Sequence, residues 1–226
     1  MLSLVVAAAV KVTVFVPVTA RLTVVEVPPP VLTSVVFATL FIARFNVFAA
    51  VALTTVTLNG YGASTIASDV LSTLSLANSL SAVTVTNTAA TTLALTLNKV
   101  TGPAALALPT YTTLNVTTAT ADSAAAITAA AATALTVAGT NVLDLTGSAL
   151  AALKTVTVSG TAGLKIDASG PTVTDVNASA TSGAVTATID ATKATYEGST
   201  GVDTVTTSAV APTKAITLGA GNDTLI

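Results

Sequence analysis

Short stretches of alternating apolar and polar residues recur along most of the chain, about ten or about twenty residues apart. Alternation with a period of two places the apolar side chains of a strand on one face. Most stretches end in Asn, Gly or Ser, which tolerate turn conformations or cap a turn with the side chain. The sequence therefore predicts many short strands joined by tight turns. The clearest stretches are residues 55–60, 73–78, 82–87, 92–98, 112–117, 134–139 and 154–160.

Recurrent short strands fit an antiparallel sandwich as well as a stacked solenoid. Two features favour the solenoid. The stretches resemble one another, as stacked repeat units do. Their apolar residues are also mostly Val, Leu, Ala and Ile, and aromatic residues make up only 4% of the chain, whereas a sandwich core about 10 Å thick usually needs large side chains. The sequence predicts an all-β fold, a parallel β-solenoid of the β-helix or β-roll kind.

We expect two stretches per rung of this solenoid. Residues 51–226 would then form roughly nine rungs that rise about 4.8 Å each, a rod on the order of 40 Å long. Residues 123–135 are rich in Ala, the best helix former, so a short helix bulging from the solenoid is an open alternative there. The chain stops inside a repeat stretch, so we expect an uncapped end, from a fragment or a module that polymerises.

Composition changes near residue 50, which predicts a boundary. All five Phe and both Arg precede it, and all thirteen Gly follow it. We expect residues 1–50 to be an atypical apolar segment (a cap, an anchor or a non-native start) and residues 51–226 to be the repeat region. A membrane span is disfavoured, because Arg44 and Asn46 interrupt the apolar stretch 31–53. A charge at the centre of a span costs roughly 2.5–3.5 kcal/mol.

Several function classes are disfavoured by composition. Cys and His are absent, which excludes Cys/His zinc sites, thiol catalysis, disulfides and histidine acid–base chemistry. The net charge of −2 does not indicate the excess of clustered Lys and Arg that binding to nucleic acid requires. We therefore predict no enzyme. One enzymatic alternative stays open, since Asp167 and Asp190 could stack on one face of a β-helix and serve a carbohydrate-active enzyme, if they share a groove beside Tyr196.

Two Gly- and Asp-containing segments lie about one rung apart, at residues 198–206 and 218–226. The second one resembles the glycine-rich nonapeptide of RTX β-roll proteins, G-G-x-G-x-D-x-U-x, and the first is a weaker copy. The resemblance implies Ca²⁺, a hard cation that takes six to eight oxygen ligands, here from turn carbonyls and the Asp carboxylates. The predicted metal-site residues are Gly198, Thr200, Gly201, Asp203, Gly219, Gly221, Asn222 and Asp223.

Three other acidic residues, Asp167, Asp175 and Asp190, are expected to cap turns rather than to bind metal. The wider run from residue 154 through residues 166–170 to the nonapeptide resembles the β-strand repeats of bacterial S-layer and RTX surface proteins. This resemblance implies type I secretion, calcium-dependent folding outside the cell, and a structural or adhesive role at the bacterial cell surface.

We therefore expect an extracellular structural repeat module, stabilised by Ca²⁺ in its C-terminal turns. Its expected partners, besides calcium, are further copies of itself or a cell-surface polysaccharide, and nucleic acid is not among them. Two alternatives stay open. One is an adhesin or passenger stalk that requires no metal, and the other is the β-helix carbohydrate-active enzyme.

Overall fold

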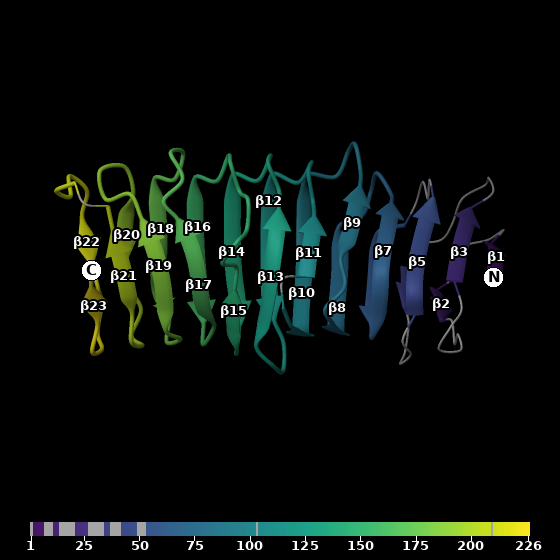
Figure 1. Ribbon diagram of the computed structural model, residues 1–226, viewed down its shortest axis with the longest axis horizontal. Coiled ribbons are helices and arrows are strands. Elements are labelled where there is room, and N and C mark those ends of the chain that lie inside the picture. The colour runs from purple at the N-terminus through teal and green to yellow at the C-terminus, as the bar shows by residue number, and fades with distance from the viewer. Residues whose placement is uncertain are drawn as a thin grey trace.

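The computed structural model describes residues 2–6, 11–13, 21–26, 34–36, 42–48, 53–102, 104–208 and 210–226, with side chains from residue 53 on. Within these residues every regular element is a strand, and no helix is present. The strands form two sheets, one of twelve and one of eleven strands. Figure 1 shows the strands side by side, in succession along the long axis of the molecule. All pairings are parallel, so the predicted parallel β-solenoid is confirmed.

Odd-numbered strands form one sheet and even-numbered strands form the other, because the chain alternates between the two sheets. The odd strands are β1 (Leu2–Val6), β3 (Arg21–Glu26), β5 (Ile42–Phe48), β7 (Tyr61–Ala67), β9 (Val83–Thr86), β11 (Ala104–Ala107), β13 (Ser123–Thr128), β15 (Val142–Asp144), β17 (Gly163–Ala168), β19 (Val185–Ile189), β21 (Thr204–Thr207) and β23 (Thr224–Leu225). The even strands are β2 (Lys11–Thr13), β4 (Ser34–Val36), β6 (Thr55–Asn59), β8 (Thr73–Ser79), β10 (Thr92–Val100), β12 (Thr113–Thr118), β14 (Ala134–Gly139), β16 (Thr155–Gly160), β18 (Asp175–Thr181), β20 (Thr195–Glu197) and β22 (Ile216–Thr217).

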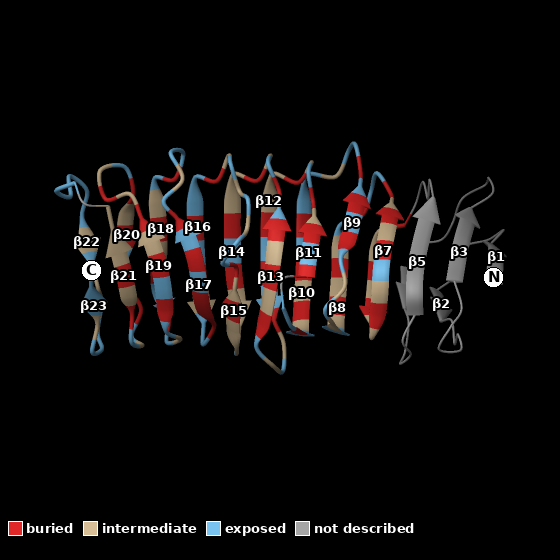
Figure 2. Ribbon diagram, in the orientation of Figure 1, coloured by how far each residue is buried: buried red, intermediate tan, exposed pale blue. Residues whose placement is uncertain are grey.

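The pairing is in register over long stretches, so like residues stack on like. Leu93 of β10 pairs with Leu114 of β12, which pairs with Leu135 of β14. All three side chains are buried between the sheets. Figure 2 shows the resulting alternation of buried and more exposed positions along the strands. The small, uniform apolar residues of the repeat therefore fill a narrow core that continues from rung to rung.

The Ala-rich segment is part of this core, and the alternative of a helix there is wrong. Strand β13 pairs with β11 on one side and with β15 on the other. Ala125 and Ile127 are buried, whereas Ala124 and Ala126 lie on the outer side. Alanine favours helices in isolation, but strand pairing and burial override this weak preference.

The two sheets contain strands from both sides of the predicted boundary near residue 50. Strand β4 pairs with β6, and β5 pairs with β7. The division of the chain into two domains stays a prediction, and the side chains before residue 53 lie outside the described ones. Nowhere in the described ranges does a helix have the length and hydrophobicity needed to cross a membrane.

A core substitution tests the stacked arrangement. Leu114→Ala should lower the free energy of unfolding by about 2–5 kcal/mol, because it removes a fully buried side chain and leaves a cavity. Thr117→Ala, at an exposed position of the same strand, should change it by no more than about 0.5 kcal/mol. Urea unfolding followed by far-UV circular dichroism measures both values. Similar losses in the two variants would contradict the assigned inward and outward faces.

Candidate functional site

The two Gly- and Asp-containing segments form turns on neighbouring rungs. The first turn joins β20 to β21, and the second joins β22 to β23. Backbone hydrogen bonds connect them: Gly198 N donates to Thr217 O at 2.7 Å, and Ala220 N donates to Ser199 O at 3.1 Å. The structure therefore stacks the two predicted segments directly on each other, as their spacing suggested.

Asp203 is the most buried acidic residue of this region, with an exposed fraction of 0%. Its Oδ1 atom accepts hydrogen bonds from Val185 N at 2.9 Å and from the Ser199 hydroxyl at 2.7 Å. Its Oδ2 atom accepts from Ser199 N at 2.7 Å and from the Tyr196 hydroxyl at 3.3 Å. Both carboxylate oxygens are thus held by neutral donors, and the side chain ties the turn to the preceding rung.

Asp223 repeats part of this arrangement one rung later. Its Oδ1 atom accepts a hydrogen bond from Asp203 N at 2.9 Å, just as Asp203 accepts one from Val185 N. Each carboxylate therefore binds a backbone N–H of the rung before it. We call this contact, in which an Asp carboxylate accepts a hydrogen bond from a backbone N–H of the preceding rung, a clamp; Asp203 and Asp223 form two successive clamps.

The glycines of the turns are needed because neighbouring turns lie so close together. A Cβ atom at Gly198 would collide with the backbone carbonyl of Leu218, and one at Gly219 would collide with that of Ser199. Gly219 also has a φ of +85°, which favours glycine. The glycine pattern therefore has a structural cause that requires no metal.

This geometry does not fit a calcium site built on Asp203. A calcium ligand must direct an oxygen at the ion, but both oxygens of Asp203 face N–H or O–H donors. Thr200 and Asn222 lie on the exposed outer part of the turns, and Thr200 N donates to Thr181 O at 3.2 Å. Across the described residues, no three acidic side chains come together in a group that could hold a metal ion.

Tyr196 contacts this cluster from within the core. It is fully buried, and burial raises the pKa of its hydroxyl, with a further increase from the nearby Asp203 carboxylate. Tyr196 consequently stays protonated and donates to Asp203. The sequence did not indicate this partner, because Tyr196 lies in a different strand and only the turn brings the two side chains together.

A second kind of turn recurs elsewhere in the solenoid. An Asp or Asn accepts hydrogen bonds from both the backbone N–H and the hydroxyl of the Ser or Thr two residues later. In Asp167–Ser169 these bonds are 3.0 and 2.6 Å long, and in Asp190–Thr192 they are 3.0 and 2.6 Å. The expectation that Asp167 and Asp190 cap turns is confirmed. The same pair of hydrogen bonds occurs at Asp144, where β15 ends in a turn, and at Asn177, inside strand β18.

Asp175 and Asp190 differ in their surroundings. The expectation that Asp175 caps a turn is wrong, because Asp175 lies in β18 and accepts a hydrogen bond from the Thr195 hydroxyl of the next rung at 2.6 Å. Asp190 forms an ion pair with Lys193 at 2.8 Å. The hydrogen bond from Lys193, with those from Thr192, lowers the pKa of Asp190 to about 2.

The carbohydrate-active alternative requires a groove that Asp167 and Asp190 share beside Tyr196, and the described residues form no such groove. Asp167 lines a surface cavity whose lining does not include Asp190. Tyr196 is buried in the core and offers no surface on which a sugar ring could stack.

No protein-family model matches the chain, and comparison with curated proteins and with solved structures gives no significant match. The resemblance to S-layer and RTX surface proteins accordingly rests on the sequence motifs and stays a prediction.

The role of Asp203 can be tested by removing its carboxylate. Asp203→Ala should lower the free energy of unfolding by about 1–3 kcal/mol, because the backbone N–H groups of Val185 and Ser199 would be left buried without acceptors. Hydrogen exchange at these two amides should accelerate. Asp175→Ala, which removes a more exposed hydrogen bond, serves as the control and should cost less. Unchanged exchange at Val185 would contradict the clamp.

Proposed function

We propose that the chain is a non-enzymatic structural repeat module of an extracellular bacterial surface protein, of the S-layer or RTX type. Its working part is the rod itself. A continuous core and in-register pairing make such a rod stiff along its axis. Secretion to the cell surface, including the type I route, belongs to this proposal through the sequence resemblance alone.

The observation that carries the proposal is the outer face of the even-numbered sheet between β6 and β16. Its outward residues are Thr, Ser, Asn, Ala and Gly, with Lys99 at the end of β10 as the charged exception. Ordinary surfaces carry about 25–35% charged residues, which keep proteins apart. The central outward residues of this face are Thr55, Thr57, Thr73, Ser75, Ala94, Thr96, Asn115, Thr117, Thr136, Ala138, Thr157 and Ser159.

This uncharged face suits contact with another uncharged surface. A second copy of the chain provides one, and a neutral cell-surface polysaccharide provides another. We favour self-association, because the outward residues of the face include no aromatic side chain on which a sugar could stack. A face made of short hydroxyl-bearing side chains also lets two sheets approach closely.

Sedimentation velocity tests this role. The purified chain should form concentration-dependent oligomers, and Thr117→Lys, which puts a charge at the middle of the face, should shift it towards monomer at least severalfold. Thr186→Lys, at an exposed position of the other sheet, is the matched control and should leave the distribution unchanged. A chain that stays monomeric at all concentrations, or that responds equally to both substitutions, would refute self-association through this face.

Calcium enters the proposal as a choice between two hypotheses. In one, Ca²⁺ locks the C-terminal turns, and in the other the module is a stalk that requires no metal. The four hydrogen bonds to the Asp203 carboxylate support the second hypothesis, because they already occupy both oxygens of one of the two carboxylates that a metal would bind.

Thermal melts distinguish the two hypotheses. The melting temperature should be the same in millimolar calcium and in excess chelator, because Asp203 closes the turn with protein donors. Magnesium serves as the control for general ionic effects. A melting temperature that rises with calcium alone, and no longer does so in Asp223→Asn, would restore the calcium-stabilised module.

A further inference from the structure

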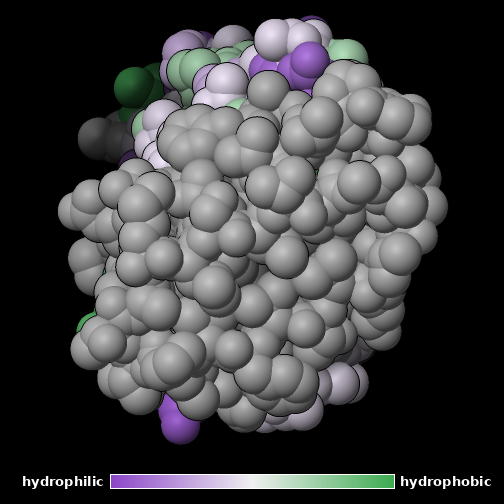
Figure 3. All heavy atoms as spheres, turned by 90° about the vertical axis from the view of Figure 1, so that its right-hand side faces the viewer, coloured by the Kyte–Doolittle hydropathy of each residue, from purple (hydrophilic) through white to green (hydrophobic). Residues whose placement is uncertain are grey.

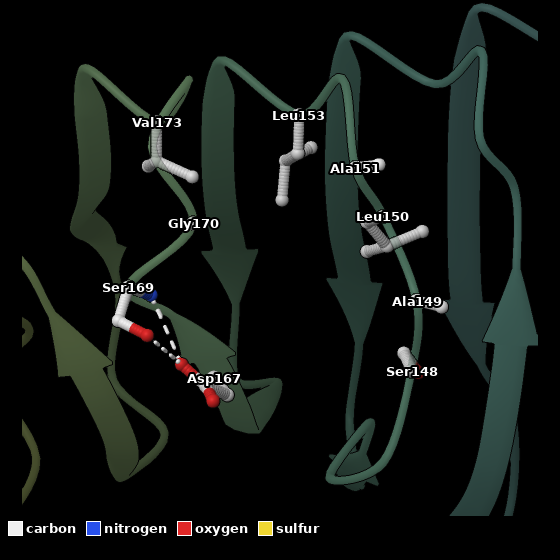
Figure 4. A pocket seen from close by; sticks show the side chains of 9 residues that line it. All are labelled: Ser148, Ala149, Leu150, Ala151, Leu153, Asp167, Ser169, Gly170 and Val173. Carbon is white, nitrogen blue, oxygen red and sulfur yellow. Dashed lines mark hydrogen bonds between the residues drawn. The ribbon is translucent and has the colours of Figure 1, made fainter.

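A cavity of about 250 Å³ opens between two neighbouring connections of the solenoid. One connection, residues 145–154, joins β15 to β16, and the other, residues 169–174, joins β17 to β18. Leu150, Leu153 and Val173 supply apolar lining, while Asp167 and Ser169 supply polar lining. Figure 4 shows Asp167 and Ser169 together at one end and Leu153 and Val173 at the other.

The cavity forms where these two connections share fewer hydrogen bonds than the paired strands do. Among the described residues, no backbone–backbone hydrogen bond joins residues 148–153 to residues 169–173. Only the Thr172 hydroxyl reaches across, 3.1 Å from Ala151 O and 2.8 Å from Leu153 O. Regular pairing resumes where Thr174 N donates to Lys154 O at 2.9 Å.

The polar end of the cavity carries an uncompensated negative charge. Asp167 is exposed, and within the described part of the chain it takes part in no ion pair. Two lysines of this part of the solenoid lie beside other carboxylates, with Lys165 4.0 Å from Asp144 and Lys193 2.8 Å from Asp190. The Oδ1 atom of Asp167 is occupied by Ser169, but its Oδ2 atom accepts no hydrogen bond from the described residues.

We propose that this cavity binds an aliphatic ammonium group, as found in a lysine side chain or a free alkylamine. The ammonium contacts the Asp167 carboxylate, and the alkyl chain lies along Leu150 towards Leu153 and Val173. An anion would be repelled by Asp167. The volume lies just below the roughly 300–1,000 Å³ of sites for drug-sized molecules, which suits a small ligand.

The same geometry selects an ammonium over a guanidinium. A guanidinium gains its advantage from two parallel hydrogen bonds to both carboxylate oxygens. Here Ser169 already donates twice to Oδ1, so one oxygen is left for the ligand. An ammonium acts as a compact point charge and needs only that one oxygen.

Nuclear magnetic resonance titration of the isotope-labelled chain tests the proposal. The probes are n-pentylamine and Nα-acetyl-lysine-N-methylamide, with 1-pentanol as the neutral analogue. Either amine should cause saturable shifts at the Leu150 and Val173 methyl groups, and 1-pentanol should bind at least tenfold more weakly. Binding of the lysine derivative identifies a lysine side chain as the ligand, and binding of pentylamine alone identifies a free amine.

Asp167→Asn is the decisive variant, because it removes the charge and keeps the turn. An Asn side chain makes the same pair of hydrogen bonds within β18, where Asn177 accepts from Ser179 N at 3.0 Å and from its hydroxyl at 2.7 Å. Amine affinity should fall at least tenfold in Asp167→Asn and stay unchanged in Asp190→Asn, which alters the same type of turn outside the cavity. Absence of binding by both amines, or equal binding by Asp167→Asn, would overturn the proposal.

Discussion

In-register parallel pairing between successive rungs is the constraint on which the rest of this structure depends. Each residue of a strand sits beside its counterpart in the next rung, as Leu93 does beside Leu114 and Leu114 beside Leu135. A core column therefore mostly keeps a similar size from rung to rung, although Tyr196 stacks between Val176 and Ile216. This explains why most core positions use a small set of aliphatic residues. The outer positions likewise repeat a small set of residues, mostly Thr, Ser, Asn and Ala.

The same constraint shapes the turns. When rungs stack closely, backbone groups of successive turns come too near for side chains, as at Gly198 and Gly219, and buried N–H groups need acceptors. Asp203 supplies such an acceptor to Val185 N, and Asp223 supplies one to Asp203 N. Glycine and aspartate at rung spacing are therefore expected in a stacked turn with or without a metal. The motif alone could not separate these two cases.

The fold could be predicted from the sequence because its evidence is local and repeated. Period-two alternation identifies the strands, and similarity between stretches indicates stacking. The segment around Ala125 was ambiguous because helix preference is a property of the isolated segment, whereas its strand is imposed by β11 and β15. The partners of Asp203 were not predictable, since Val185 lies 18 residues away and reaches it only through the exact length of one rung. The Asp167–Ser169 turn, by contrast, is encoded within three residues.

Uniform stacking also limits where such a protein can recognise anything specifically. The face from β6 to β16 looks nearly the same at every rung, so contacts made through it can slide by one rung with little change in energy. A unique site requires a departure from the repeat. The connection 145–154 is longer than the connection 169–174, and beside this mismatch lies the cavity with the unpaired Asp167 carboxylate. Regular faces thus suit assembly, while irregular connections provide position-specific binding.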